Sequence, residues 1–202
     1  MCFVMRLYYF SLLFLAFLVF GCDSKKPKDS QAKDRVENSS ISSVGYNQKL
    51  EVVRANFKRI NSIKHWTVID SVELDDSTEG GQAKFYFANK QLQKIVAVYY
   101  GESGKNVIEY YLLDSKLSFV YREDIRYNRP IYWNESDDDE KFDSEKSAIS
   151  KTRSYFFNDV LFEQIKETKE SQEILKDHLE KQQESIQADY SSLKQLSLVR
   201  QI

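Results

Sequence analysis

The stretch Tyr86-Phe-Ala-Asn89-Lys-Gln-Leu92 decides the fold, because the chain repeats its pattern twice more. The second copy is Tyr111-Leu-Leu-Asp114-Ser-Lys-Leu117, and the third is Tyr155-Phe-Phe-Asn158-Asp-Val-Leu161. Each copy places Asn or Asp three residues after Tyr, and Leu three residues further on. Asn and Asp tolerate the left-handed backbone of a tight turn, and the flanking residues favour strands, so each copy predicts a β-hairpin. Tyr and Leu would then pack across the two strands of each hairpin.

These copies resemble the Tyr-x-x-Asn-Gly-x-Leu hairpin repeats of MORN-variant proteins and of Bacteroidetes-type envelope lipoproteins. The resemblance covers the chain from Gly80 to Lys166. It implies a repeat fold and an envelope location, but no chemistry, because this family has no settled activity. The sequence departs from the family pattern at the glycine, which is replaced by Lys90, Ser115 and Asp159. We therefore expect loops slightly longer than the two-residue type I′ turn.

One helix is expected before the repeats in the sequence and another after them. Between Asn47 and Ile63, apolar residues recur with helical spacing, and a strand with a period of two follows from Trp66 to Leu74. The helical stripe consists of Leu50, Val53, Phe57 and Ile60. From about Glu167 to Val199, a second stripe indicates a helix on the order of 45 Å long. Its residues are Leu175, Leu179, Ile186 and Leu193. This helix either protrudes and mediates self-association or folds back along the sheet.

The sequence therefore predicts an α+β fold with an N-terminal helix, an antiparallel β-meander of about six strands built from hairpin repeats, and a long C-terminal helix. Residues 96–98 and 108–113 are apolar at consecutive positions, so we expect a helix to cover one face of the sheet. The expected organisation is a lipoprotein signal peptide (1–21), a disordered tether (22–45), a helix and β-repeat domain (46–166) and an amphipathic C-terminal helix (167–202).

The first residues have the features of a bacterial lipoprotein leader. Arg6 precedes an apolar run, Leu7–Phe20, that is shorter than the roughly 20 residues needed to cross a bilayer. Val19-Phe20-Gly21-Cys22 then resembles a lipobox, which directs lipid to the cysteine, although Phe20 stands where a small residue is usual. An ordinary signal peptide with an accidental Gly-Cys pair is the alternative. We expect lipid on Cys22 to hold the protein at a membrane of the bacterial cell envelope, in the periplasm or at the cell surface.

Composition argues against several classes of function. The formal net charge is −2, or −3 once Arg6 leaves with the leader, whereas nucleic-acid binders carry a basic surplus. Cys22 is the only cysteine after the leader, and His65 and His178 lie far apart. No Gly-x-Ser-x-Gly motif and no glycine-rich phosphate loop occurs, and no free cysteine remains as a nucleophile if Cys22 carries lipid. We therefore expect a non-catalytic binding or structural module without cofactor, metal or nucleic acid; an envelope hydrolase using a carboxylate pair is the alternative.

One segment combines aromatic and basic side chains. Its candidate ligand-binding residues are Arg126, Tyr127, Arg129, Tyr132 and Trp133. Planar rings and guanidinium donors suit a protein or glycan partner. The favoured alternative is another strand, with Tyr127, Ile131 and Trp133 inward, the arginines outward and Pro130 at an edge. The acidic run at 137–140 with Asp143 is expected to be a solvated loop, because it lacks the spacing and glycine of a calcium loop.

Replacing Cys22 with serine tests the membrane anchor. Acyl chains contribute roughly 0.8 kcal/mol per buried CH₂, and two or more chains anchor a protein stably where one is marginal. A Cys22→Ser protein should therefore leave the membrane fraction or keep its leader, as measured by fractionation and intact mass. An unmodified Cys22 in the mature wild-type protein would contradict this expectation.

Overall fold

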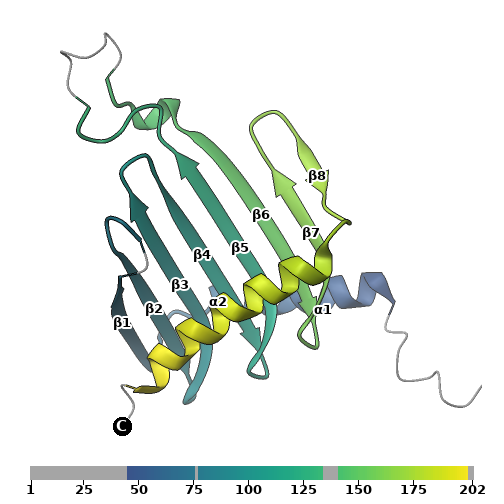
Figure 1. The fold of residues 1–202 in the computed structure, drawn as a ribbon. Coiled ribbons are helices and arrows are strands. Elements are labelled where there is room, and N and C mark those ends of the chain that lie inside the picture. Colours follow the sequence, from purple (N-terminus) through teal and green to yellow (C-terminus); the bar gives the residue numbers. More distant parts are fainter. Residues whose placement is uncertain (1–44, 76, 134–140, 200–202) are drawn as a thin grey trace, which may run out of the picture. The chain divides into compact units, whose positions relative to one another are not determined.

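The computed structural model describes residues 45–75, 77–133 and 141–199. The predicted leader, Cys22, almost the whole tether and the acidic run at 137–140 lie outside these described residues. Within them the fold is α+β, as predicted (Figure 1). The elements are α1 (Tyr46–Asn61), β1 (Val68–Leu74), β2 (Gly81–Ala88), β3 (Gln91–Gly101), β4 (Gly104–Leu113), β5 (Lys116–Arg126), a short 3₁₀ turn (Ser144–Lys146), β6 (Ala148–Phe157), β7 (Val160–Glu167), β8 (Gln172–Ile174) and α2 (Leu179–Val199).

The described strands form one antiparallel sheet in sequence order, from β1 to β8. The predicted meander is therefore confirmed, with eight strands in place of about six. Part of the difference is β8, which lies where the sequence predicted the start of the C-terminal helix. The backbone N–H of Thr168 donates to the carbonyl of Ser171 at 2.8 Å, and this turn brings β8 back alongside the end of β7.

The three repeats form equivalent hairpins with two-residue turns. Ala88 pairs with Gln91, and the other two hairpins close in the same way. Both turn residues have positive φ in every case: 52° and 61° at Asn89 and Lys90, 51° and 65° at Asp114 and Ser115, and 52° and 64° at Asn158 and Asp159. This is type I′ geometry, so the expectation of longer loops is wrong. The type I′ turn matches the twist of the strands, and that match outweighs the cost of left-handed backbone at non-glycine residues.

A β-bulge follows each turn, where Gln93, Ser118 and Phe162 are the extra residues. Tyr and Leu of one repeat lie on opposite faces of the sheet, so the prediction that they pack across the hairpin is wrong. The reason is the register: Leu117 pairs with Leu112, which follows Tyr111 and so points to the other face. The three tyrosines do occupy equivalent positions, on β2, β4 and β6.

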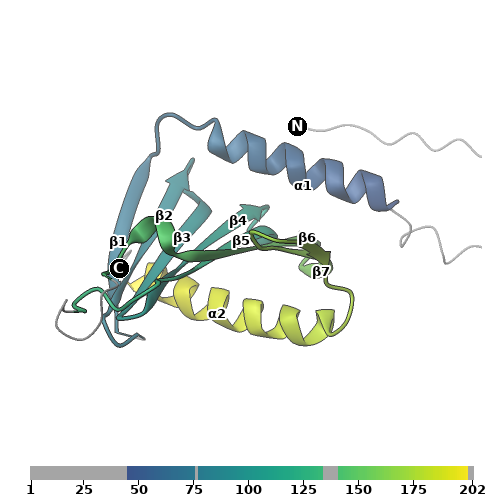
Figure 2. The ribbon, with the colours of Figure 1, turned by 90° about the horizontal axis from the view of Figure 1, so that it is seen from above.

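Each face of the sheet carries one helix, not only one face as expected (Figure 2). On the face that we call the α1 face, Val53 and Ile60 pack against Tyr111 and Phe119. Asn56 takes the buried position expected for Phe57 because its side-chain N–H donates to the carbonyl of Leu112, at 3.1 Å. Helix α1 is therefore fixed to the middle of the sheet by both apolar and polar contacts.

Helix α2 lies along the opposite face, which we call the α2 face (Figures 1 and 2). It starts at Leu179, later than predicted, since β7 and β8 use the preceding residues. Leu193 is buried there, and Leu179 and Ile186 pack against the same cluster. Of the two arrangements that the sequence left open, the described chain thus has the one in which the helix folds back and its stripe contacts the sheet.

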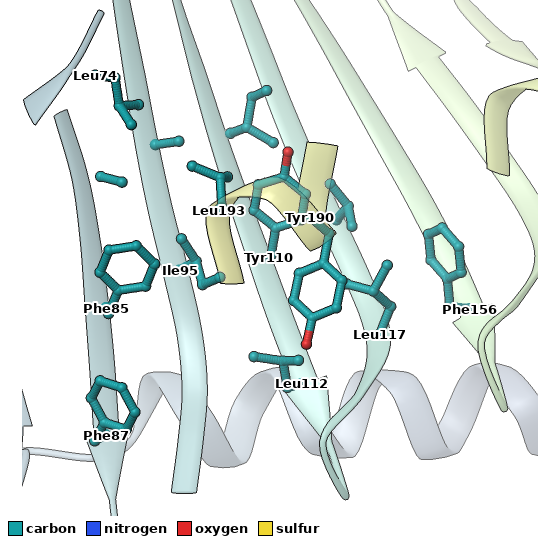
Figure 3. Packing of buried hydrophobic residues seen from close by; sticks show 14 of the residues in the cluster. Leu74, Phe85, Phe87, Ile95, Tyr110, Leu112, Leu117, Phe156, Tyr190 and Leu193 are labelled. Atoms are coloured by element: carbon teal, nitrogen blue, oxygen red, sulfur yellow. The ribbon is translucent and has the colours of Figure 1, made fainter. Parts of the chain in front are cut away.

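One cross-strand row on the α2 face is apolar where it begins and polar where it ends, and Figure 3 shows the apolar part. Phe85, Ile95 and Tyr110 sit opposite one another on β2, β3 and β4, and all three are buried. The same cross-strand row ends in Ser154 and Gln164, which are also buried and are hydrogen-bonded to each other at 2.9 Å. This row is therefore apolar at β2 to β5 and polar at β6 and β7, whereas Phe156 and Leu161 extend the apolar core onto those two strands close to their turn.

Glycine at the second position of the first turn tests the turn geometry. Left-handed backbone costs a non-glycine residue roughly 1–2 kcal/mol, so Lys90→Gly should raise the free energy of unfolding by about 1 kcal/mol in urea titrations. Lys84→Gly, in the middle of β2, is the control and should lower it by roughly 0.5–1 kcal/mol. Equal destabilisation by both substitutions would contradict a type I′ turn.

Candidate functional site

The aromatic and basic segment predicted as a site forms an exposed loop after β5. The strand ends at Arg126, and residues 127–133, all of them described, contain no strand. The strand interpretation is therefore wrong, and Ile131 and Trp133 are 50% and 38% exposed. The loop docks on the β3–β4 turn instead, because the backbone N–H groups of Tyr127 and Ile131 donate to the carbonyls of Ser103 and Glu102.

The loop brings only some of its predicted site residues together. The Arg129 guanidinium lies 5.7 Å from the centroid of the Trp133 ring, and Tyr132 is exposed nearby in the sequence. Tyr127 packs edge-on against Phe142, with ring centroids 5.2 Å apart, so it anchors the loop. Arg126 stays at the end of β5. The cavities described next are lined by other residues.

Two adjoining cavities of about 310 and 410 Å³ lie between α2 and the sheet. They share Ile108, Arg122 and Asp189 among their lining residues, and we call them together the α2 groove. Small-molecule sites commonly measure roughly 300–1,000 Å³, so each half of the groove has a suitable size. The groove therefore is a stronger candidate site than the exposed loop.

Successive cross-strand rows on the α2 face build the floor of the groove. One row aligns Asn106 with Asp124; the next aligns Ile108, Arg122, Thr152 and Lys166; the third aligns Tyr110, Val120, Ser154 and Gln164. Alternate residues of a strand point to the same face, so the residues of these three rows present their side chains to the α2 face. Helix α2 supplies the wall through Gln182, Ile186 and Asp189.

The polar centre of the groove is built around Asp124. Its Oδ1 accepts hydrogen bonds from Arg122 Nε, at 3.2 Å, and from the side-chain N–H of Asn106. The Arg122 and Asp124 side chains are about half exposed, at 47% and 48%, and such ion pairs contribute about 0–1 kcal/mol. Arg122 can therefore exchange this contact for one with a ligand at little cost.

Asn106 also carries an unused acceptor. Its side-chain carbonyl oxygen is buried and has no hydrogen-bond partner among the described residues. Leaving a buried polar group unsatisfied costs about 1–3 kcal/mol. Asn106 lines the groove, so a hydroxyl or N–H donor of a ligand that reaches this oxygen would recover part of that cost.

Two tyrosines meet beneath α2 and point in opposite directions (Figure 3). Burial raises the pKa of Tyr110, Asp189 raises it further and Arg122 opposes the shift, as expected for a hydroxyl directed into the groove. Burial raises the pKa of Tyr190 to about 12, and Asp159 adds to the shift. The Tyr190 hydroxyl is buried without a hydrogen-bond partner in the described ranges. Tyr110 can serve a ligand, whereas Tyr190 belongs to the core.

The described residues contain neither a metal-binding cluster nor a membrane-spanning helix. Within the described ranges, no group of three or more His, Cys, Asp or Glu residues could hold a metal ion. His65 follows α1, and His178, with φ of 65°, precedes α2 and so lies outside the helix that the sequence predicted there. Neither described helix is long and apolar enough to cross a membrane.

The groove was not predicted from the sequence because its lining residues come from five strands, β3 to β7, from helix α2 and from two connecting segments. The alternation of Arg122 and Asp124 along β5 was the available signal. Comparison with known protein families, with curated proteins and with solved structures gave no match. The chemistry of the groove is therefore the basis for assigning a function.

Alkaline pH should destabilise the fold through Tyr190. Its pKa rises from the ordinary 10.0 to about 12 on folding. Because the folded value is the higher one, the contribution to stability is complete below pH 10 and is lost as the pH rises towards 12. Tyr190→Phe should reduce this loss, as measured by urea unfolding across that pH range.

The same substitution has a matched control at neutral pH. Tyr190→Phe removes an unpartnered hydroxyl and should leave stability unchanged or raise it by about 1 kcal/mol. The hydroxyl of Tyr111 bonds to Glu109 and lies 3.0 Å from Lys94 Nζ, so Tyr111→Phe should lower stability by about 1 kcal/mol. A larger loss for Tyr190→Phe than for Tyr111→Phe would overturn this assignment.

Proposed function

We propose that this protein is a lipid-anchored, non-catalytic binding module of the bacterial cell envelope whose ligand occupies the α2 groove. The anchor is the lipid on Cys22 that the lipobox-like sequence indicates. The groove is the feature that favours binding over a purely structural role, because its polar groups converge on a space large enough for a small molecule.

The observation that carries the proposal is the polar centre formed by Asn106, Arg122 and Asp124. Arg122 offers donors, Asp124 offers an acceptor, and Asn106 offers the unpaired carbonyl oxygen. Tyr110, which is buried, lines the same space. Donors and acceptors of both charge signs next to an aromatic ring suit a neutral or zwitterionic polar ligand, such as a saccharide or a short peptide.

Binding of defined probes to the full mature chain tests the proposal. We expect a panel of mono- and disaccharides and of dipeptides to contain at least one compound that raises the thermal unfolding temperature. Arg122→Gln should weaken the binding of that compound about tenfold, since it removes charge-assisted hydrogen bonds. Isothermal titration calorimetry measures the change in Kd.

Arg126→Gln is the matched control, because Arg126 lies on the same strand and the same face as Arg122 but does not line the groove. The groove proposal requires Arg126→Gln to bind as the wild type does. Loss of binding in Arg126→Gln alone would move the site to the loop of residues 126–133. Absence of binding by every probe class at millimolar concentration would contradict a small-molecule site in the groove.

A carboxylate-pair hydrolase is the second candidate, because Asp124 and Asp189 both line the groove. Paired carboxylates divide the roles of acid and base or nucleophile in such enzymes. The hydrogen bonds from Arg122 and Asn106 already engage Asp124, and this favours binding over catalysis. Release of products from a bound disaccharide or dipeptide by the wild type, but not by Asp189→Asn, would establish the hydrolase instead.

A further inference from the structure

Another cavity, of about 200 Å³, opens on the α1 face and is separate from the two cavities of the groove. Helix α1 contributes Val53, Arg54 and Phe57, β5 contributes Phe119, and β6 contributes Arg153 and Tyr155. We call it the α1 pocket. Apart from Val53, the lining residues are aromatic or arginine, and no carboxylate is among them.

The aromatic wall follows from how α1 docks. Because Asn56 takes the buried position, Phe57 stays 40% exposed at the edge of the helix. Its ring stands edge-on to Phe119, with centroids 5.4 Å apart, and the Phe119 ring lies 5.1 Å from that of Tyr155. The three rings form an open apolar cup that accepts a flat or branched apolar group.

The two arginines differ in how they are held. Arg153 Nη1 lies 2.5 Å from Glu167 Oε2, and this bond raises the pKa of Arg153 and fixes its side chain beside the cup. Arg54 is exposed and makes no hydrogen bond or ion pair with the part of the chain that the structure describes. The nearby Glu163 is buried and accepts a hydrogen bond from Tyr46, at 2.6 Å. An unpaired cation is thus available at the mouth of an aromatic cup.

We propose that the α1 pocket binds a carboxylic acid that carries a single ring or branched aliphatic group. The apolar group lies against Phe57, Phe119 and Tyr155, and the carboxylate meets Arg54, with Arg153 as a second donor. The pocket is smaller than the roughly 300 Å³ of ordinary ligand sites, so it accommodates one ring and its acid group. This goes beyond the function proposed above, since the site and the charge of its ligand are different.

Titration with phenylacetate tests the proposal, using the full mature chain with Cys22→Ser so that no detergent competes for the ring. Benzyl alcohol keeps the ring without the charge, acetate keeps the charge without the ring, and phenethylamine reverses the charge. Phenylacetate should bind at least about fivefold more tightly than each of the three, because only it satisfies both the rings and the arginines. Chemical shifts in nuclear magnetic resonance spectra measure the Kd and locate the site.

Two variants on α1 distinguish binding in the pocket from a general electrostatic attraction of phenylacetate to a basic helix. Arg54→Gln should weaken phenylacetate binding about threefold to fivefold, in line with an exposed ion pair, and should leave benzyl alcohol binding unchanged. Lys58→Gln, one turn further along the same helix and outside the pocket, should bind phenylacetate as the wild type does. Both positions are exposed, so neither substitution threatens the fold.

Three outcomes would overturn the proposal. They are equal binding of phenylacetate and benzyl alcohol, equal effects of Arg54→Gln and Lys58→Gln, and shifts confined to residues of the α2 groove. Arg122→Gln distinguishes the two sites, because it should leave phenylacetate binding unchanged whether or not the groove has a ligand of its own.

Discussion

The turns at residues 89–90, 114–115 and 158–159 each reverse the chain in two residues, and the face of every following side chain depends on that count. Side chains alternate between faces along a strand, so one additional turn residue would exchange the faces. With two residues and a bulge, Tyr111 reaches helix α1 while Leu117 reaches the core beneath α2. The same alternation of side chains places Arg122 and Asp124 in the groove and Arg153, on the other face, in the α1 pocket.

The two candidate sites are consequences of how the helices cover the sheet. Helix α2 seals the row that begins with Phe85 and Ile95, but the continuation of that row is polar and leaves space. Helix α1 docks through a buried Asn56 and therefore leaves Phe57 at its edge. One polar site and one aromatic, cationic site result, on opposite faces of a single sheet.

The sequence was sufficient for the fold class, the hairpin repeats and the first helix, because each has a strong local period. It misjudged the turns, since Lys90, Ser115 and Asp159 carry left-handed backbone that is usually reserved for glycine. It also extended the last helix through Leu175, because a heptad-like spacing cannot reveal that β8 pairs with β7. The groove was not predictable in this way, since register across β4 to β7 brings Asn106, Arg122 and Lys166 onto one surface.

The strict neighbour-to-neighbour order of the sheet has a kinetic consequence. Every described strand pairs only with the strands next to it in sequence, and the connection at residues 127–147, between β5 and β6, is the long loop that must close as the sheet forms. Loop-closure entropy slows folding mainly when distant segments must meet. The hairpins of this sheet can thus form one at a time as the chain folds, whereas closure of the β5–β6 connection joins them and docking of α1 and α2 requires the sheet to be in place.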